Sequence, residues 1–325
     1  MKKRFSVTKN AKIFVAISLA IILAGIIAYF AEGFVPGIDF SGGTILTLNM
    51  GKTFTSADSP ALQAIVDKYM ADNGIKGDKI VSASQGDQAI IRYQANADNP
   101  DAEKTMRIAL ETEIKKTYPG LTEASRESVG PTAGREMQLN ALYSVTIACI
   151  LILIYVAIRF EFVYGIAAIA SLIHDVLIMA AVMIFTRTQV NSTFIAAMLT
   201  IVGYSINDTI VLFDRIRENV KKMKGLPREE IVDISFLETL VRTLNTSLTV
   251  FFTLMALYFL GVQSIKEFAM PLLVGVISGT YSSILIAAPI WIWIHNANDK
   301  RRKAKIAARK QQAKGGKKQL SKSKA

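Results

Sequence analysis

Apolar residues gather into six long stretches of the chain, separated by stretches in which polar and charged residues dominate. A helix needs about 20 apolar residues to cross about 30 Å of hydrocarbon, and each stretch reaches or approaches that length. The pattern therefore predicts six membrane-spanning helices. The fifth is the weakest prediction, because its stretch is short and rich in threonine and serine. The stretches are residues 13–30, 140–157, 163–185, 193–213, 245–260 and 268–293.

The polar region between the first two predicted helices, residues 31–139, has a different pattern. Alternating, β-branched segments indicate strands, and apolar residues at helical spacing indicate helices. The resulting order, βαββαβ, is that of a ferredoxin-like α+β domain. We expect strands at 44–48, 79–84, 88–94 and 121–129, and helices at 60–72 and 101–117. The fold class predicted is thus an α-helical membrane protein with a small extracytoplasmic α+β domain between helices 1 and 2.

The distribution of basic residues predicts the orientation. The chain carries a formal net charge of +12, and its basic residues include 5 in residues 1–12, 7 in 214–242 and 12 in 294–325. Residues 31–139 hold 11 basic and 15 acidic residues. Because cytoplasmic segments carry the excess of Lys and Arg, we expect both termini in the cytoplasm and 31–139 outside. The location expected is the bacterial cytoplasmic membrane.

This orientation divides the chain into a cytoplasmic N-terminus (1–12), a first helix (13–30), an outer domain (31–139), five further helices (140–293) and a basic tail (294–325). The first apolar stretch lacks an A-x-A site at its end, so we interpret it as an uncleaved helix. The tail is expected to be disordered. Its charges are interpreted first as orientation signals, with attraction to anionic lipid or ribosomal RNA as alternatives. No nucleic-acid partner is expected.

Two carboxylates interrupt the predicted spans, Asp175 in the third and Asp208 in the fourth. A charged side chain near the bilayer centre costs about 2.5–3.5 kcal/mol on insertion scales. Such residues usually face a bundle interior and serve an ion path, a proton relay or a polar contact between helices. The plainer alternative is a protonated acid that hydrogen-bonds to a neighbouring helix.

Asp214 marks the cytoplasmic end of the fourth predicted helix. Asp208 precedes it by six residues and therefore lies about 9 Å inside the membrane from that end, at 1.5 Å per residue. Arg242 opens the fifth helix at a similar depth, and its long stem could reach that carboxylate. A guanidinium favours the ionised acid, whereas apolar burial favours the protonated acid. A site that alternates between those surroundings would bind and release a proton. Ser205 and Asn207 are interpreted as polar support, or as contacts between helices.

Enzymatic and metal chemistry have little support in the sequence. The single cysteine, Cys149, cannot form an internal disulfide or a cysteine-based metal cluster. His174 has no second ligand at helical spacing in its segment, so we interpret it as a hydrogen-bonding partner beside Asp175. We find no nucleophile–base pair. The protein is therefore expected not to be an enzyme and to bind no metal or other cofactor.

Two glycine-containing motifs flank the outer domain, and each alone is a weak signal. The first follows helix one and resembles a turn between helix and strand, because its glycines permit unusual backbone conformations. The second leads from the domain into helix two. Their characteristic residues are Gly37, Asp39, Phe40, Gly42 and Gly43 in the first motif, and Gly130, Pro131 and Gly134 in the second.

Together with segments in helices three to five, these motifs resemble the SecF branch of the SecD/SecF family, within the resistance-nodulation-division superfamily. The resemblance covers residues 10–295. The segments are His174-Asp175, Gly203-Tyr204-Ser205-Ile206-Asn207-Asp208, Asp214-Arg215-Ile216-Arg217-Glu218-Asn219 and Arg242-Thr243-Leu244-Asn245-Thr246.

The resemblance implies a subunit that works with SecD beside the SecYEG channel and uses the proton-motive force to promote preprotein export. It implies that SecD is a separate chain here, that protons are the coupling ion, and that Asp208 and Arg242 belong to the proton pathway. Expected partners are SecD, SecYEG, unfolded preprotein and membrane lipid. Two alternatives stay open: a passive scaffold of the translocon, and a small-molecule exporter of the same superfamily.

Overall fold

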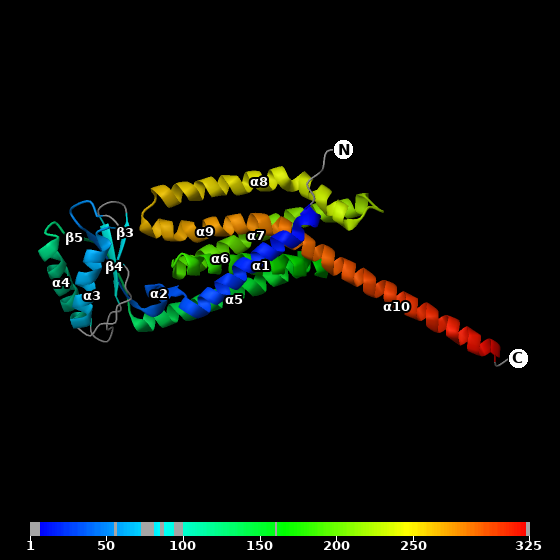
Figure 1. Cartoon of the computed structure of the whole chain (residues 1–325), viewed down its shortest axis with the longest axis horizontal. Helices are drawn as coiled ribbons and strands as arrows, with labels where there is room; N and C mark the ends of the chain where they lie inside the picture. The colour runs from blue at the N-terminus through cyan, green and yellow to red at the C-terminus, as the bar shows by residue number, and fades with distance from the viewer. Residues whose placement is uncertain are drawn as a thin grey trace.

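The computed structural model describes residues 7–54, 57–72, 81–84, 88–93, 100–159 and 161–322. Long helices form a bundle, and a small sheet domain lies at one end of it (Figure 1). The helices of the bundle are α1 (Val7–Glu32), α5 (Pro131–Arg159), α6 (Phe162–Phe185), α7 (Ser192–Lys222), α8 (Arg228–Leu260), α9 (Gln263–Ser282) and α10 (Ala288–Lys322), with the π-helix η1 (Ser283–Ala287) joining the last two.

Six helices in the described residues are long and apolar enough to cross a membrane, which confirms the six predicted spans. The sixth is built from α9, η1 and the first part of α10, and runs from Ser264 to Ile306. The fifth, which was the weakest prediction, belongs to the 33-residue helix α8. Its apolar second half follows a polar first half, and this explains why the apolar stretch alone was short.

The centre of the bundle is formed by α6, α7 and α9, which pack against one another. About half of each central span is buried, compared with 6% of α5 and 17% of both α1 and α8. The outer helices instead expose large apolar side chains, among them Ile27, Ile158 and Phe252. In water such a surface would be costly, whereas hydrocarbon solvates it. The arrangement is that of a membrane protein.

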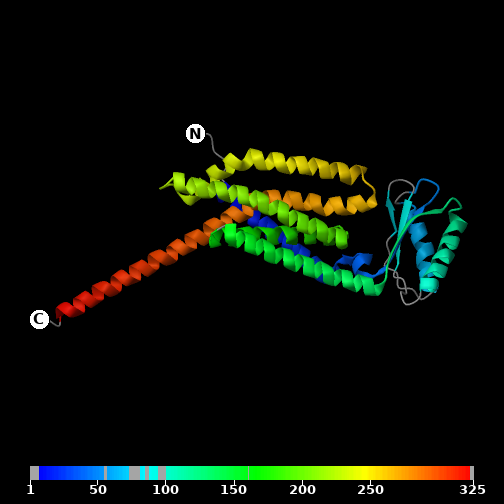
Figure 2. The same ribbon diagram turned by 180° about the vertical axis from the view of Figure 1, so that it is seen from behind.

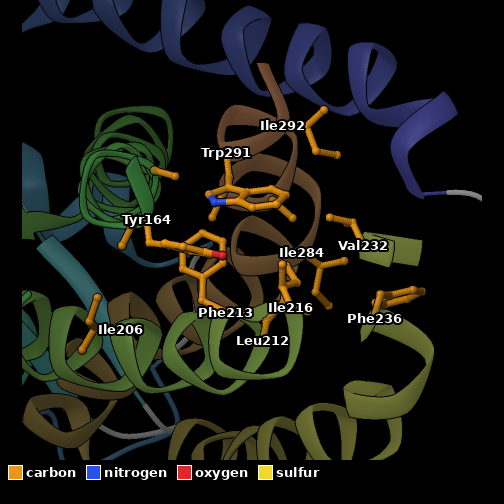
Figure 3. Close-up of a cluster of buried hydrophobic side chains, with 14 of the residues drawn as sticks. Tyr164, Ile206, Leu212, Phe213, Ile216, Val232, Phe236, Ile284, Trp291 and Ile292 are labelled. Carbon is orange, nitrogen blue, oxygen red and sulfur yellow. The ribbon is translucent and has the colours of Figure 1, made fainter. Parts of the chain in front are cut away.

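Aromatic side chains pack the bundle at the end away from the sheet domain (Figure 3). Tyr164 of α6 lies between Phe213 of α7 and Trp291 of α10, with ring centroids 5.3 and 5.2 Å away. Trp291 is 1% exposed. This contact fixes the start of α10 against the central helices, beyond which α10 projects away from the bundle (Figures 1 and 2).

The sheet domain contains four antiparallel strands and two helices. The strands are β2 (Gly43–Asn49), β3 (Val81–Ser84), β4 (Gln88–Tyr93) and β5 (Thr122–Val129), in the spatial order β3-β4-β2-β5, and the helices are α3 (Ser59–Asp72) and α4 (Pro100–Thr117). Both helices cover the face of the sheet that points away from the bundle (Figure 2). Alternate residues such as Leu46 and Leu48 pack under them. The other face is turned toward the membrane helices.

The structure differs from the sequence-based expectations in two places. The first glycine motif, expected as a turn, contains a short helix, α2 (Ile38–Ser41), because Gly37 can start it and Gly42 can end it with a positive φ of 69°. The basic tail, expected to be disordered, continues α10 to Lys322; it is rich in Ala, Lys, Gln and Arg, which favour helix. The strand expected at 79–84 is described only from Val81, and residues 79 and 80 lie outside the described residues.

We predict that the close contact between α1 and α6 depends on Gly25. A Cβ atom there would lie 2.4 Å from Ala181 Cβ and 3.0 Å from its Cα, so the helices would have to separate. Gly25→Ala should destabilise the chain by about 1–3 kcal/mol, the usual cost of overpacking, and lower its melting temperature in detergent. Gly203→Ala is the control, because a Cβ there meets nothing within 4 Å. Equal melting temperatures for the two variants would contradict this packing.

Candidate functional site

Asp175, in the middle of α6, is completely buried and is the centre of a polar cluster. Its carboxylate accepts hydrogen bonds from three serine hydroxyls: Ser205 of α7 at 2.6 Å, and Ser278 and Ser282 of α9 at 2.7 and 2.9 Å. A buried charge or polar group is costly unless it is hydrogen-bonded. This one carboxylate therefore connects all three central helices.

Small residues let the helices come close enough for these bonds. A Cβ atom on Gly279 would lie 3.0 Å from Ser205 Cβ, and one on Gly275 would lie 2.4 Å from Ile201 Cγ1. Ser278 and Ser282 are four residues apart, so they lie on the same face of α9. Gly275 and Gly279 let α9 pack closely against α7. This close packing helps to bring hydroxyl donors within reach of Asp175.

A chain of hydrogen bonds leads from Asp175 toward α1. His174 Nδ1 lies 3.1 Å from Asp175 Oδ1, His174 Nε2 lies 3.0 Å from the Tyr281 hydroxyl, and that hydroxyl lies 3.2 Å from Ser18 Oγ. His174 is 7% exposed and Ser18 is 3% exposed. The sequence indicated His174 as a hydrogen-bonding partner, and the structure places it between two such partners.

Asp208, three residues beyond Ser205 on α7, faces α8 instead. It is 5% exposed, and its Oδ2 atom has no hydrogen-bond partner among the described residues. The Ser247 hydroxyl and the Arg242 guanidinium of α8 are the groups that interact with this carboxylate. Arg242 itself is exposed. Asp208 is therefore a buried acid with an incomplete set of partners.

The sequence-predicted site residues thus fall into two groups. Arg242 lies near enough to attract the Asp208 carboxylate electrostatically, but no ion pair joins the two among the described residues. Ser205, expected as polar support or as a contact between helices, makes such a contact with Asp175 of α6, and Asn207 lies on the exposed surface of α7. Sequence reasoning missed the partners contributed by other helices, namely Ser18, Ser247, Ser278, Tyr281 and Ser282. Their hydroxyls at membrane depth were the available signal.

The two glycine motifs pack against each other at the outer end of the bundle. A Cβ on Gly134 of α5 would lie 3.1 Å from the Gly42 nitrogen, and Gln138 donates a hydrogen bond to the Phe40 carbonyl at 2.5 Å. Gly43 has a φ of 132° and no room for a Cβ, which would lie 2.7 Å from the Tyr93 carbonyl. Gly130 immediately precedes α5 and Pro131 is its first residue.

Asp39 of the first motif holds the start of α7. Its Oδ2 accepts a hydrogen bond from the Ser192 backbone nitrogen at 2.9 Å, and Asn191 accepts one from the Phe194 nitrogen at 2.9 Å. A carboxylate is favourable at a helix N-terminus, where backbone N–H groups lack partners. Nearby, β1 (Val35–Pro36) pairs in parallel with β6 (Gln189–Val190). The helix that carries Asp208 is therefore tied to the loop that enters the sheet domain.

An ion pair ties the sheet domain to α9. Arg92 of β4 lies 3.0 Å from Glu267, and their side chains are 10% and 20% exposed. Asn191 also reaches Glu267, at 3.5 Å. Burial lowers the pKa of the Arg92 guanidinium, and attraction to Glu267 opposes that shift. Because α9 also carries Ser278 and Ser282, one continuous helix connects the sheet domain to Asp175.

These features define a multi-pass membrane protein with carboxylates buried among its central helices and an attached sheet domain. Residues 109–297 match the family model of the protein export membrane protein SecD/SecF, C-terminal. The chain is 39% identical over 292 residues to the protein translocase subunit SecF of Petrotoga mobilis, covering 90% of this chain and 96% of that protein. The chain belongs to the SecD/SecF family, and the predicted role in protein export is confirmed.

In other relatives a region similar to this chain is part of a longer chain. The protein translocase subunit SecDF of Bacillus subtilis is 39% identical over 293 residues, and this chain spans 38% of its length. The crystal structure of SecDF from Thermus thermophilus, described as a translocon-associated membrane protein, matches 91% of this chain with a TM-score of 0.78 and 34% identity. A structure of SecDF in a super-membrane-facing form gives 0.66. This chain spans 39% and 40% of those two chains.

We predict that Arg92 is needed to hold the sheet domain on α9. Arg92→Ala leaves Glu267 partly buried without its counter-charge, at a cost on the order of 3 kcal/mol. Hydrogen exchange should therefore rise at least tenfold in β4 and in the first turn of α9. Arg107→Ala is the control, because Arg107 pairs with Glu111 and Glu123 inside the domain. If exchange at the start of α9 rose equally in both variants, the assigned role of Arg92 would be wrong.

Proposed function

We propose that this protein couples proton movement across the bacterial cytoplasmic membrane to preprotein export, with Asp208 as the proton carrier and Arg242 as the group that tunes its proton affinity. The observation that carries the proposal is the buried Oδ2 of Asp208, which has no partner among the described residues. Unsatisfied buried polar groups are rare and are often functional. A carboxylate with a free oxygen has a place for a proton.

The energy available is sufficient for such coupling. One proton that moves through 100 mV releases about 2.3 kcal/mol, which corresponds to about a 50-fold bias in a two-state equilibrium. The two states would differ in how α7 and α8 pack around Asp208. Movement of α7 would reach the outer end of the bundle, because Asp39 holds the first residue of that helix.

The partner that completes the site is proposed to be SecD. Asn207 of α7 is exposed in this chain, and so is a row of polar residues on α8. Polar side chains at membrane depth usually face other helices or water rather than lipid, and the SecDF relatives carry their additional sequence in the same chain. We propose that helices of SecD cover this surface. The row consists of Arg242, Asn245, Thr246, Thr249 and Thr253.

The sheet domain is proposed to be extracytoplasmic and ferredoxin-like, and to contact unfolded preprotein as it leaves SecYEG. Its strand order and its two helices on one face support the ferredoxin-like assignment. Its edge strand β5 is exposed along residues 122–128, and an exposed edge can pair with an extended chain. In this proposal the proton is the coupling ion and no other cofactor takes part.

We predict that the sheet domain lies outside the cytoplasm and both termini inside. The sheet domain and the two described ends of the chain lie at opposite ends of the bundle (Figure 1), and the basic residues gather near the termini and between α7 and α8. A reporter that is active only outside the cytoplasm should be active after Lys104 and inactive after Lys224. The reverse pattern would contradict the proposed orientation.

We predict that Asp208→Asn retains binding to SecD but loses the part of export that depends on the proton gradient. The amide keeps the shape of the side chain and cannot carry a proton. Arg242→Ala should weaken the same step several-fold, because the carboxylate loses its counter-charge. The measurement is preprotein translocation into membrane vesicles with and without a proton gradient.

Asp214→Asn is the matched control, since Asp214 lies on the same helix but is partly exposed and paired with Arg159. It should retain full stimulation by the gradient. The passive-scaffold alternative predicts that Asp208→Asn also retains it, provided that SecD still binds. Full stimulation of Asp208→Asn would therefore remove the proposed role of this carboxylate and favour the scaffold.

A further inference from the structure

Asp175 has an environment unlike that of Asp208, and this difference suggests a separate role. Besides its contact with His174, three serine hydroxyls donate to it, from Ser205, Ser278 and Ser282. A hydroxyl can donate to an ionised carboxylate, and it can turn and accept from a protonated one. An arginine or lysine in the same place could only donate. The surroundings of Asp175 therefore satisfy the acid in both protonation states.

The groups that face Asp175 and His174 come from four helices. Helix α6 contributes Ser171, which donates to Ser282 at 3.0 Å. Helices α7 and α9 contribute the three serines and Tyr281, and α1 contributes Ser18. Of these groups only His174 and Tyr281 are titratable, and none of the described contacts is with a lysine or arginine. Asp208 lies one turn along α7 from Ser205 and faces α8.

His174 is placed to transfer a proton to Asp175. Its two ring nitrogens lie 3.1 Å from the carboxylate and 3.0 Å from the Tyr281 hydroxyl, so a proton can bind at Nε2 while the proton on Nδ1 leaves for Asp175. The Tyr281 hydroxyl gives up a proton to Nε2 and regains one from Ser18, which is replenished by hydronium from water. One N–H bond and one O–H bond form for each that breaks.

We propose that Asp175 is a second proton-binding carboxylate, reached from Ser18 through Tyr281 and His174, and that its ionised form holds α6 against α7 and α9. On protonation the acid gains a donor and loses an acceptor site. The hydrogen bonds that the serines of α7 and α9 donate then weaken, because a hydrogen bond to an ionised group is about twice as strong as one between neutral groups. The packing of the helix that carries Asp208 thus depends on the protonation of Asp175. This inference goes beyond the proposed function, which rests on Asp208 alone.

The next segment of the sixth span fits this role. Ser283 begins the π-helix η1 directly after Ser282, and its hydroxyl lies 2.8 Å from Thr209 Oγ1 of α7. Short π-helical segments occur frequently at functional sites. The hydroxyl contacts therefore continue along α7 past Ser205, on the side of the helix that faces α9. A rearrangement at Ser282 would be passed directly to the contact between Ser283 and Thr209.

The test is infrared spectroscopy of the full chain in lipid vesicles, which reports the C=O stretch of protonated carboxylic acids. On acidification the wild type should show a band that is missing in Asp175→Asn, and a different band that is missing in Asp208→Asn. Asp175→Glu should shift the first band and keep the second. It serves as a second variant if Asp175→Asn does not fold.

The route is tested by the rate at which the Asp175 band rises after a rapid drop in pH. Tyr281→Phe should slow that rise at least tenfold. Tyr204→Phe is the matched control, because the buried Tyr204 hydroxyl has no hydrogen-bond partner among the described residues, and it should leave the rate unchanged. Absence of an Asp175-dependent band would show that Asp175 does not bind a proton. An unchanged rate in Tyr281→Phe would show that the proton does not reach Asp175 through Tyr281. Because neither readout involves export, failure here is distinguishable from failure of the role of Asp208.

Discussion

A carboxylate inside hydrocarbon must have its hydrogen bonds met by the protein, and this constraint shapes the centre of the bundle. Asp175 receives hydrogen bonds from serines of two neighbouring helices, and glycines of α9 bring the backbone of α9 close to α7 beside these serines. The hydrogen bonds of Asp175 and the close packing of α7 and α9 are thus built from the same stretch of small residues. Larger residues in place of the glycines would force α9 away from α7 and disturb the serines that both helices present to the carboxylate.

The same central helices carry the connections to the sheet domain. At its outer end α7 is held by Asp39, and α9 is held by the pair of Glu267 with Arg92. Further along, α7 bears Asp208 and α9 bears the serines that bind Asp175. The helices that carry Asp208 and the partners of Asp175 are therefore tied, at their outer ends, to the sheet domain or to the loop that enters it. Coupling requires such a continuous physical connection between two sites, together with an element that has two arrangements.

The sequence predicted the elements better than it predicted the contacts between them. Hydropathy identified all six spans, because the membrane imposes one minimum length on every apolar helix. The hydrogen bonds from Ser278 and Ser282 to Asp175 depend on the relative rotation and height of two helices, which the pattern of a single helix does not contain. Ser205 was expected as polar support or as a contact between helices, and only the structure identifies its partner as Asp175.

Local conformation was also harder to predict where glycine or charge dominates. The first glycine motif was expected as a turn, since glycine permits many conformations, but it forms the short helix Ile38–Ser41 that packs on α5. The tail was expected to be disordered because of its charge, yet its helix-favouring composition extends α10. By contrast, the electrostatic attraction of Arg242 for Asp208 was expected from depth alone, since both lie near the same end of adjacent helices, although no ion pair joins them among the described residues.

The central claim is that Asp208 carries protons across this bundle, and proton flux tests it most directly. Liposomes would contain this protein together with purified SecD, an enclosed pH-sensitive dye and an imposed proton gradient. The account predicts that flux above the background of empty liposomes is present in the wild type and in Asp214→Asn but is lost in Asp208→Asn. Equal flux in all three proteins would contradict it.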